Sequence, residues 1–141
     1  MDTGKLIAQI RDHEGCVLHA YRDSQGYLTI GIGRLIDGRL GGGISLEEAE
    51  LLFANDLARA ERDLDTSLMW WRRLDEVRQR ALVELCLNLG IRGLLRFHDT
   101  LRRLEAGEWA AASVALLASL WAEQVGPTRA GRLAEMVRDG K

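Results

Sequence analysis

The sequence has few of the residues that mark disulfide-rich, membrane-spanning or disordered proteins. Its 141 residues include two cysteines and one proline. Two cysteines cannot provide a disulfide framework, and we expect both to be reduced and buried. The longest nearly apolar stretch, residues 110–122, has 13 residues, whereas a membrane-spanning helix needs about 20. The N-terminus also lacks the basic region and apolar segment of a secretory signal.

Charge is nearly balanced, with 19 basic and 21 acidic residues and a formal net charge of −2. Nucleic-acid binding usually needs a dense basic patch, so we expect no nucleic-acid partner. The three histidines and two cysteines lack the spacing of metal ligands. Gly31-Ile32-Gly33 is only part of a dinucleotide-binding motif, because no glycine follows at the required interval. We therefore expect neither a metal nor a cofactor.

Hydrophobic periodicity predicts a single α+β domain, residues 1–141, that is mainly helical. A small antiparallel sheet follows the first helix, and Ser45 with Glu48 forms a capping box that begins a long helix. The sheet is too small to be stable alone and must pack on helices. We expect strands near residues 17–21, 27–32 and 34–36, and helices near 3–14, 46–65, 74–90, 94–104, 109–121 and 129–139.

The first predicted helix ends in an unusual residue. Its apolar positions are Leu6, Ile7 and Ile10, and Glu14 lies four residues after Ile10 on the same stripe. Burial and the negative end of the helix dipole both disfavour a charged carboxylate. Glu14 is therefore a candidate proton donor. The alternative is a structural glutamate that pairs with an arginine at the helix end.

A second carboxylate lies in the predicted hairpin. Asp23 falls in the turn nine residues after Glu14, and Thr29 lies six residues later on the returning strand. The hairpin would place Asp23 and Thr29 on one cleft wall, facing the end of the first helix. Two carboxyls in different surroundings can divide the roles of acid and base. Alone, Asp23 is equally a turn residue that bonds its own backbone, and Thr29 an ordinary strand residue.

The combination of these residues closely resembles the active-site segment of T4-type phage lysozymes. That family has the pattern E-x8-D-x5-T, in which the threonine opens a T-I-G-x-G strand, and Glu14, Asp23 and Thr29 fit it. Further matching segments follow in the family's order over nearly the whole chain: 43–50, Leu87-Asn88-Leu89-Gly90, Phe97 with Thr100-Leu101, Trp121, and Thr128-Arg129-Ala130-Gly131-Arg132.

The resemblance implies a lysozyme-like fold and a peptidoglycan muramidase. The expected fold has a sheet lobe at about 15–44, an interdomain helix at about 46–65, and a helical lobe of residues 1–14 plus 66–141. The expected reaction hydrolyses the β-1,4 bond between N-acetylmuramic acid and N-acetylglucosamine. The partners implied are peptidoglycan glycan strands, with no stable membrane insertion, and we expect a monomer.

The resemblance also assigns roles to individual residues. Glu14 would be the general acid, and Asp23 with Thr29 would activate a water for inversion of the anomeric centre. Inverting enzymes hold their two carboxyls roughly 6.5–9.5 Å apart. Arg129 would pair with Glu14 and support catalysis. Three residues would line the substrate cleft, with packing or surface roles as the alternative: Leu35, Asn88 and Thr100.

The sequence departs from the family at Arg34, where a histidine is usual. An arginine does not titrate near neutral pH, so an ion pair at this position would be less sensitive to pH. We predict that removal of Arg34 lowers thermal stability more than activity. Leu87 also stands where an aromatic residue is common, and the segment 35–43 is short, which implies a trimmed sheet lobe.

Two other functions stay open. A lytic transglycosylase would need the acid but no activated water, and an inactive cell-wall-binding module would need neither. Trp70-Trp71 is an exposed wall-binding patch in that interpretation, although helix packing is the simpler explanation. Since no signal peptide is present, we expect the protein in the host cytoplasm until it is released to the wall, or in the virion as part of a tail protein.

Overall fold

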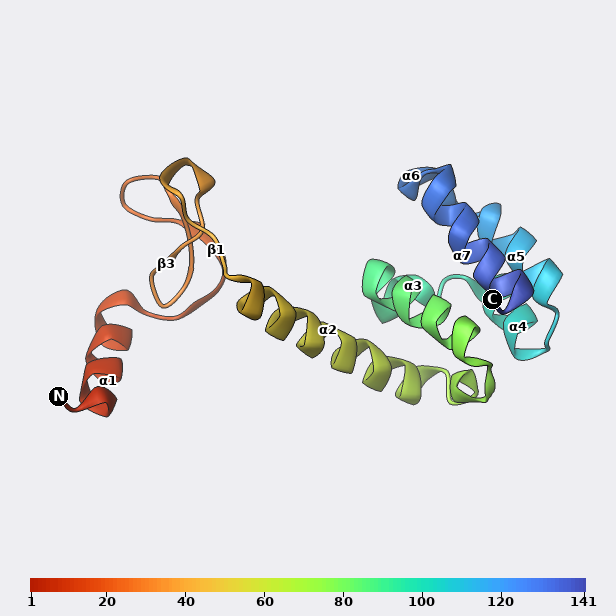
Figure 1. The fold of residues 1–141 in the computed structure, drawn as a ribbon, viewed down its shortest axis with the longest axis horizontal. Coiled ribbons are helices and arrows are strands. Elements are labelled where there is room, and N and C mark those ends of the chain that lie inside the picture. The colour runs from red at the N-terminus through yellow and green to blue at the C-terminus, as the bar shows by residue number, and fades with distance from the viewer. The chain divides into compact units, whose positions relative to one another are not determined.

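The computed structural model describes residues 1–141 and has the expected α+β class, with a three-stranded sheet and seven α-helices (Figure 1). The chain forms two compact units, residues 1–51 and residues 52–141. The boundary falls inside the long helix α2 (Leu46–Ser67), which begins at the predicted capping box. The predicted division into lobes, with residues 1–14 in the helical lobe, stays a prediction.

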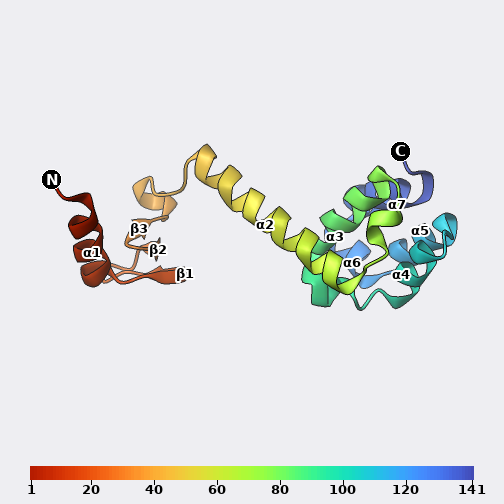
Figure 2. The ribbon, with the colours of Figure 1, turned by 90° about the horizontal axis from the view of Figure 1, so that it is seen from below.

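The first unit contains the whole sheet. After α1 (Thr3–Glu14) come β1 (Val17–Arg22), β2 (Leu28–Gly31) and β3 (Arg34–Leu35), followed by the short 3-10 helix η1 (Gly38–Leu40). The strands are antiparallel in the order β1-β2-β3, so β2 is central (Figure 2). The register between β1 and β2 shifts once between Val17 and Tyr21, as a bulge does.

Helix α1 differs from its prediction in two ways. Asp2, and not Thr3, caps the helix, because its side chain accepts a hydrogen bond from the Lys5 amide. No residue of α1 is buried, and Ile7 is 52% exposed. The expectation that Glu14 belongs to a buried stripe is therefore not confirmed.

Polar interactions hold the first unit together. Its only two buried residues are Thr29 and Asp37. The Asp37 carboxylate accepts hydrogen bonds from the Leu28 amide and from the amide and guanidinium of Arg39. The Arg39 guanidinium also lies over the Tyr27 ring. Asp37 thereby connects the start of β2 to η1, the segment that follows β3 in the chain.

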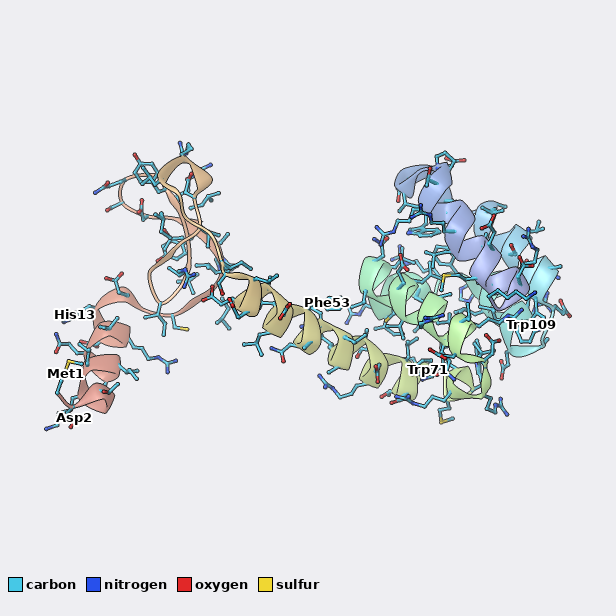
Figure 3. All side chains as sticks on the ribbon, viewed as in Figure 1. Met1, Asp2, His13, Phe53, Trp71 and Trp109 are labelled. Carbon is cyan, nitrogen blue, oxygen red and sulfur yellow. The ribbon has the colours of Figure 1, made fainter.

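The second unit contains the hydrophobic core. Its elements are the rest of α2, the 3-10 helix η2 (Trp71–Arg73), α3 (Glu76–Leu94), α4 (His98–Glu105), α5 (Trp109–Leu117), α6 (Leu120–Val125) and α7 (Pro127–Asp139). Its largest fully buried side chains are leucines together with Val137. Each such leucine stabilises the folded state by about 1.5–3 kcal/mol relative to exposure. Side chains from all these helices, among them Trp71, contribute to one hydrophobic core (Figure 3).

Two helix predictions in this unit are wrong in detail. The helix expected at 109–121 is two helices, because Ser119 caps a new one by accepting from the Ala122 amide. The helix expected to begin near residue 94 begins at His98. The preceding helix α3 continues to Leu94 across a non-helical Gly90. Glycine tolerates the positive φ at that kink.

The two cysteines are both free, as expected, but only one is buried. Cys86 lies in the core, where burial raises the pKa of its thiol. Cys16 is exposed, contrary to the prediction that both are core residues. None of the helices combines the length and apolar character required to cross a bilayer.

The partner of Arg34 is Glu48, at the start of α2. Two guanidinium nitrogens donate to the two carboxylate oxygens of Glu48, at 3.0 and 2.8 Å, and Nε donates to the Gly43 carbonyl at 3.1 Å. Hydrogen bonds from the Ser45 amide and from Arg34 lower the pKa of Glu48. The pair thus keeps its charge at neutral pH and loses it only when acid protonates Glu48.

Replacement of Arg34 by methionine is expected to lower Tm by a few degrees at neutral pH, because two hydrogen bonds to Glu48 of α2 and one to the Gly43 carbonyl are lost. The rate of the expected peptidoglycan hydrolysis should change little. Arg80→Met, which breaks a 3.9 Å surface pair with Glu76, is the control and should leave Tm almost unchanged. A loss of rate that exceeds the loss of stability would contradict this prediction.

Replacement of Asp37 by asparagine is expected to destabilise the protein at neutral pH. The hydrogen bonds from Arg39, and then that from Leu28, lower the pKa of Asp37. A carboxyl whose pKa is lower in the folded state than in the unfolded state stabilises the folded protein at pH values above its unfolded-state pKa, which is near 4. This stabilisation disappears as the pH falls through the folded-state pKa.

The difference in Tm between wild type and Asp37→Asn should therefore be constant from pH 5 to 7 and shrink below about pH 4. Thermal unfolding followed by circular dichroism across this range measures it. Asp12 is exposed and makes no hydrogen bond in the structure, so Asp12→Asn is the matched control. Equal pH dependence in both variants would refute the assigned role of Asp37.

Candidate active site

The side chain of Glu14 lies against the turn between β2 and β3. A Cβ atom placed on Gly33 would lie 2.8 Å from Glu14 Oε2 and 3.1 Å from its carboxyl carbon. Gly33 also has φ +69°, which favours glycine. The positive φ therefore disfavours other residues at position 33, and a side chain there would have to displace the end of the Glu14 side chain, which now lies against the bare backbone.

Glu14 is the last residue of α1, and Gly15 ends the helix with φ +71°. The Gly15 amide donates to the Arg11 carbonyl and closes the last turn. Glu14 is exposed and lies at the C-terminal end of α1, where the negative end of the helix dipole lies.

Asp23 has the structural role that the sequence offered as an alternative, and it keeps a free oxygen as well. Its Oδ1 accepts from the Gln25 and Tyr27 amides, both at 2.9 Å, and so fixes the turn between β1 and β2. Its Oδ2 makes no hydrogen bond in the structure. The turn therefore orients one oxygen and leaves the other available to a ligand or a water molecule.

Thr29 lies in the central strand and is 5% exposed. Its hydroxyl donates to the Tyr27 carbonyl at 3.2 Å, so Thr29 and Asp23 both bond to the backbone of Tyr27. On one side Thr29 pairs with Tyr21, and on the other with Leu35 of β3. The structure thus places Leu35 beside Thr29 on the sheet and Asp23 in the turn that leads into β2, while Glu14 lies against Gly33 in the turn after β2.

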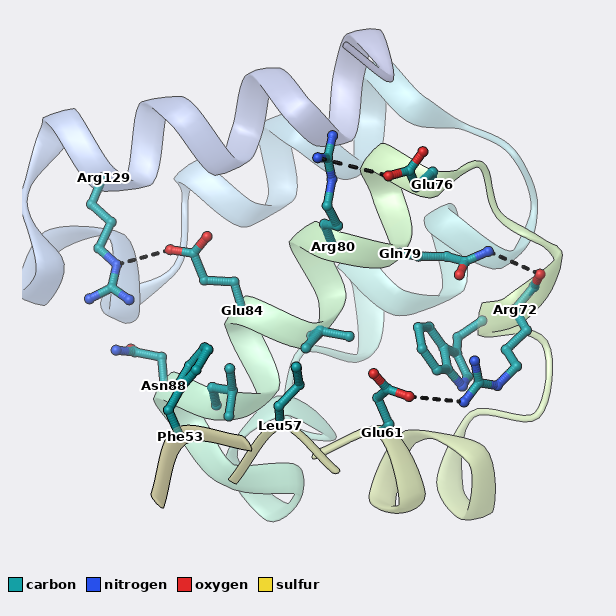
Figure 4. A pocket seen from close by; sticks show the side chains of 13 residues that line it. Phe53, Leu57, Glu61, Arg72, Glu76, Gln79, Arg80, Glu84, Asn88 and Arg129 are labelled. Atoms are coloured by element: carbon teal, nitrogen blue, oxygen red, sulfur yellow. Dashed lines mark hydrogen bonds and ion pairs between the residues drawn. The ribbon is translucent and has the colours of Figure 1, made fainter. Parts of the chain in front are cut away.

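The other predicted site residues belong to the second unit. Asn88 and Arg129 line a cavity of about 670 Å³ whose apolar wall includes Phe53 and Leu57 (Figure 4). Arg129 Nε donates to Glu84 Oε1 at 3.4 Å. Sequence reasoning did not identify Glu84 as a partner of Arg129. The predicted pairing of Arg129 with Glu14 stays a prediction.

Asn88 is oriented by Trp121. The indole nitrogen of Trp121 donates to Asn88 Oδ1 at 2.7 Å, which leaves the amide group of Asn88 free to donate to a ligand. Trp121 also lines a second cavity, of about 660 Å³, together with Phe97 and Thr100. Thr100 is 4% exposed. Trp121 thus connects the two cavities in which the sequence predicts substrate contacts.

The charges around the first cavity are paired. Arg72 bonds both Asp65 and Glu61, and Arg80 lies 3.9 Å from Glu76. Hydrogen bonds from Arg72, and then from the Trp71 indole, lower the pKa of Asp65. Nowhere do three or more His, Cys, Asp or Glu side chains gather in a way that could hold a metal ion.

Comparison with known proteins supports the resemblance in the sequence. The family model described as phage lysozyme matches residues 11–135. The pre-baseplate central spike protein Gp5 of Enterobacteria phage T4 is 32% identical over 96% of this chain, which spans only 28% of that protein. The probable T4-type lysozymes 1 and 2 of Dictyostelium discoideum are 27% and 28% identical, with 96% of both chains covered in each case.

Proposed function

Because the chain belongs to the phage lysozyme family, we propose that it hydrolyses the β-1,4 bond between N-acetylmuramic acid and N-acetylglucosamine with inversion. As a lysozyme it is a glycoside hydrolase, and its substrate is peptidoglycan. The observation that carries the finer proposal is the contact of the Glu14 carboxylate with Gly33. It holds a proton donor against the sheet that carries Asp23 and Thr29.

Glu14 is the general acid in this proposal. It protonates the glycosidic oxygen as the bond to the anomeric carbon breaks, so that the leaving sugar departs as a neutral alcohol. The free carboxyl is exposed, and a bound glycan would cover it and remove water. General-acid catalysis requires that Glu14 carry its proton when the glycosidic bond breaks.

Asp23 and Thr29 supply the water in this proposal. The free Oδ2 of Asp23 accepts a proton from the attacking water, and the hydroxyl oxygen of Thr29 accepts a second hydrogen bond from it. Because the Thr29 hydroxyl already donates its hydrogen to the Tyr27 carbonyl, its oxygen can act only as an acceptor toward the water. The water adds to the face opposite the leaving oxygen, which inverts the anomeric centre.

The dimensions of the sheet support this division of roles. Glu14 contacts the turn after β2, and Asp23 lies in the turn before β2. A four-residue strand such as β2 spans about 10 Å between its end residues. Side chains that converge from its two ends can reach the separation of roughly 6.5–9.5 Å typical of inverting enzymes.

We propose two possible settings for this activity. The similarity to a central spike protein supports a virion-associated domain that opens the host wall. The similarity over nearly the full length of two lysozymes supports a free endolysin. In either setting the partner is the glycan strand, and Leu35, Asn88 and Thr100 are the proposed contacts, with Arg129 as support for Glu14.

Glu14→Gln is expected to abolish hydrolysis, because glutamine cannot donate a proton to the leaving oxygen. Purified peptidoglycan digested by wild type should yield reducing muramic acid ends, measured by mass spectrometry after borohydride reduction. The variant should yield about a hundredfold fewer, or less.

The new chain ends also separate the alternative functions. Anhydromuramic ends in the wild-type digest would indicate a lytic transglycosylase in place of a hydrolase. Absence of new ends, together with retained binding to the wall, would indicate an inactive binding module. Unchanged activity of Glu14→Gln would remove this residue from the role of acid.

Gly33→Ala tests the contact between the acid and the sheet. The methyl group would occupy the position of the Glu14 carboxylate and displace it, so we expect kcat to fall about tenfold or more. Gly31→Ala is the matched control, because Gly31 has φ +68° but no atom lies within 4 Å of an added Cβ.

Both alanine variants should lose similar stability, about 1–2 kcal/mol, from the left-handed backbone conformation. Only Gly33→Ala should lose catalysis beyond what its stability explains. Kinetics at a temperature well below both melting transitions make the comparison. Equal activity in the two variants would show that the contact between Glu14 and Gly33 does not matter for the reaction.

A further inference from the structure

The four tryptophans divide into two pairs. Trp71 and Trp121 are buried, and each donates its indole N–H to another side chain. Trp70 and Trp109 are only partly buried, and neither indole N–H makes a hydrogen bond in the structure. No buried polar side-chain atom lacks a partner, so both of these N–H groups face solvent.

Trp70 and Trp109 line two hollows that share a wall. One, of about 450 Å³, extends from Trp70 toward Thr66 and Met69, and the other, of about 320 Å³, extends from Trp70 to Trp109. Both are also lined by Arg73 and Glu105. We call these two hollows the tryptophan groove. None of the predicted site residues lines it.

The polar groups of the tryptophan groove are available to a ligand. Arg73 and Glu105 are 76% and 52% exposed, and their closest charged atoms lie 3.9 Å apart. This distance is too long for a hydrogen bond. Opposite charges at that separation leave the groove without net charge. Its donors and acceptors therefore suit a neutral polar ligand better than an anion or a basic peptide.

The Trp109 ring is fixed in place. The Arg78 guanidinium lies 4.1 Å from its centroid, and Arg78 is itself held by the Val137 and Arg138 carbonyls. Gly107, with φ +77°, lies beside the ring, and because it has no side chain it leaves that part of the ring uncovered. A rigid aromatic surface loses little conformational entropy when it binds a ligand. Figure 3 labels Trp109 in the helical unit, where it is partly buried.

We propose that the tryptophan groove is a second glycan-binding site, which takes a neutral amino sugar of the peptidoglycan strand. A sugar ring in β-linked form has an apolar face of C–H groups that stacks on tryptophan, and equatorial hydroxyl and acetamido groups at its edge. Trp70 and Trp109 supply the apolar surface, and their indole N–H groups, Arg73 and Glu105 supply hydrogen bonds.

The choice of ligand rests on the proposed function, since a lysozyme meets glycan strands at high local concentration. A site apart from the catalytic residues would hold the enzyme on the wall between cleavage events. This gain needs no high affinity, because the two sites bind one polymer and act together.

The test uses the indole N–H signals of the full chain in proton–nitrogen NMR spectra. Glu14→Gln serves as the parent, and the probe is the tetramer of N-acetylglucosamine, which resembles the glycan backbone without its peptides. We expect saturable shifts of the Trp70 and Trp109 signals, while the buried Trp71 signal stays in place. Single Trp→Phe variants assign each signal.

Arg73→Ala should weaken binding at these signals about tenfold or more, the loss expected for one hydrogen bond to a charged group. Arg102→Ala is the matched control, because Arg102 is 61% exposed and pairs with Asp99 outside the groove. Its affinity should equal that of the parent. Arg73 is largely exposed, so its variant will fold even if Trp70→Leu, which should also weaken binding, does not.

Three results would overturn the proposal: no shift of Trp70 and Trp109 up to solubility of the tetramer, shifts confined to Trp121, or equal weakening by Arg102→Ala. The failure of the proposed function has a different signature. In that case wild type releases no new peptidoglycan chain ends, whatever the indole signals show.

Discussion

The absence of a side chain at position 33 is the constraint on which the active site depends. A Cβ at this position would lie only 2.8 Å from Glu14 Oε2, so any other residue would force the Glu14 side chain to move. The positive φ of Gly33 independently disfavours other residues. The glycine thus permits the close approach of the Glu14 carboxylate to the sheet.

The first unit obtains its order from polar groups, in contrast to the second. Its two buried residues, Thr29 and Asp37, are polar, so burial of apolar area contributes little to the sheet. Hydrogen bonds to the Asp37 carboxylate and the three bonds of Arg34 replace a hydrophobic core. The second unit has a conventional core of leucines and alanines.

The sequence predicted the order and type of almost every element, because helical periodicity, the Ser45 capping box and the hairpin turn are local signals. The prediction from sequence failed where a single side chain determines the residue at which a helix begins. Ser119 begins a new helix inside a run that is apolar on most sides, and Asp2 replaces Thr3 as a cap. Both outcomes depend on one hydrogen bond to one amide, which a hydrophobic pattern does not encode.

The candidate site was predictable as a set of residues and less so as an arrangement. The spacing of Glu14, Asp23 and Thr29 was enough to select them. It did not indicate that Asp23 would use one oxygen for its own turn, or that Arg129 would bond Glu84. These contacts depend on side-chain directions and on charges far apart in the chain. The exposure of Glu14 was missed because the apolar stripe of α1 was assumed to be buried.

The unequal environments of the two cysteines have a practical consequence. Cys16 is exposed and follows Glu14 by two positions, whereas Cys86 is enclosed in the core, with its sulfur 3.9 Å from the Ala60 carbonyl. A thiol-directed fluorophore or spin label would therefore attach to the folded chain at one place. That place is two residues from Glu14, the proposed general acid, so the chain already contains a reporter position that would test glycan entry.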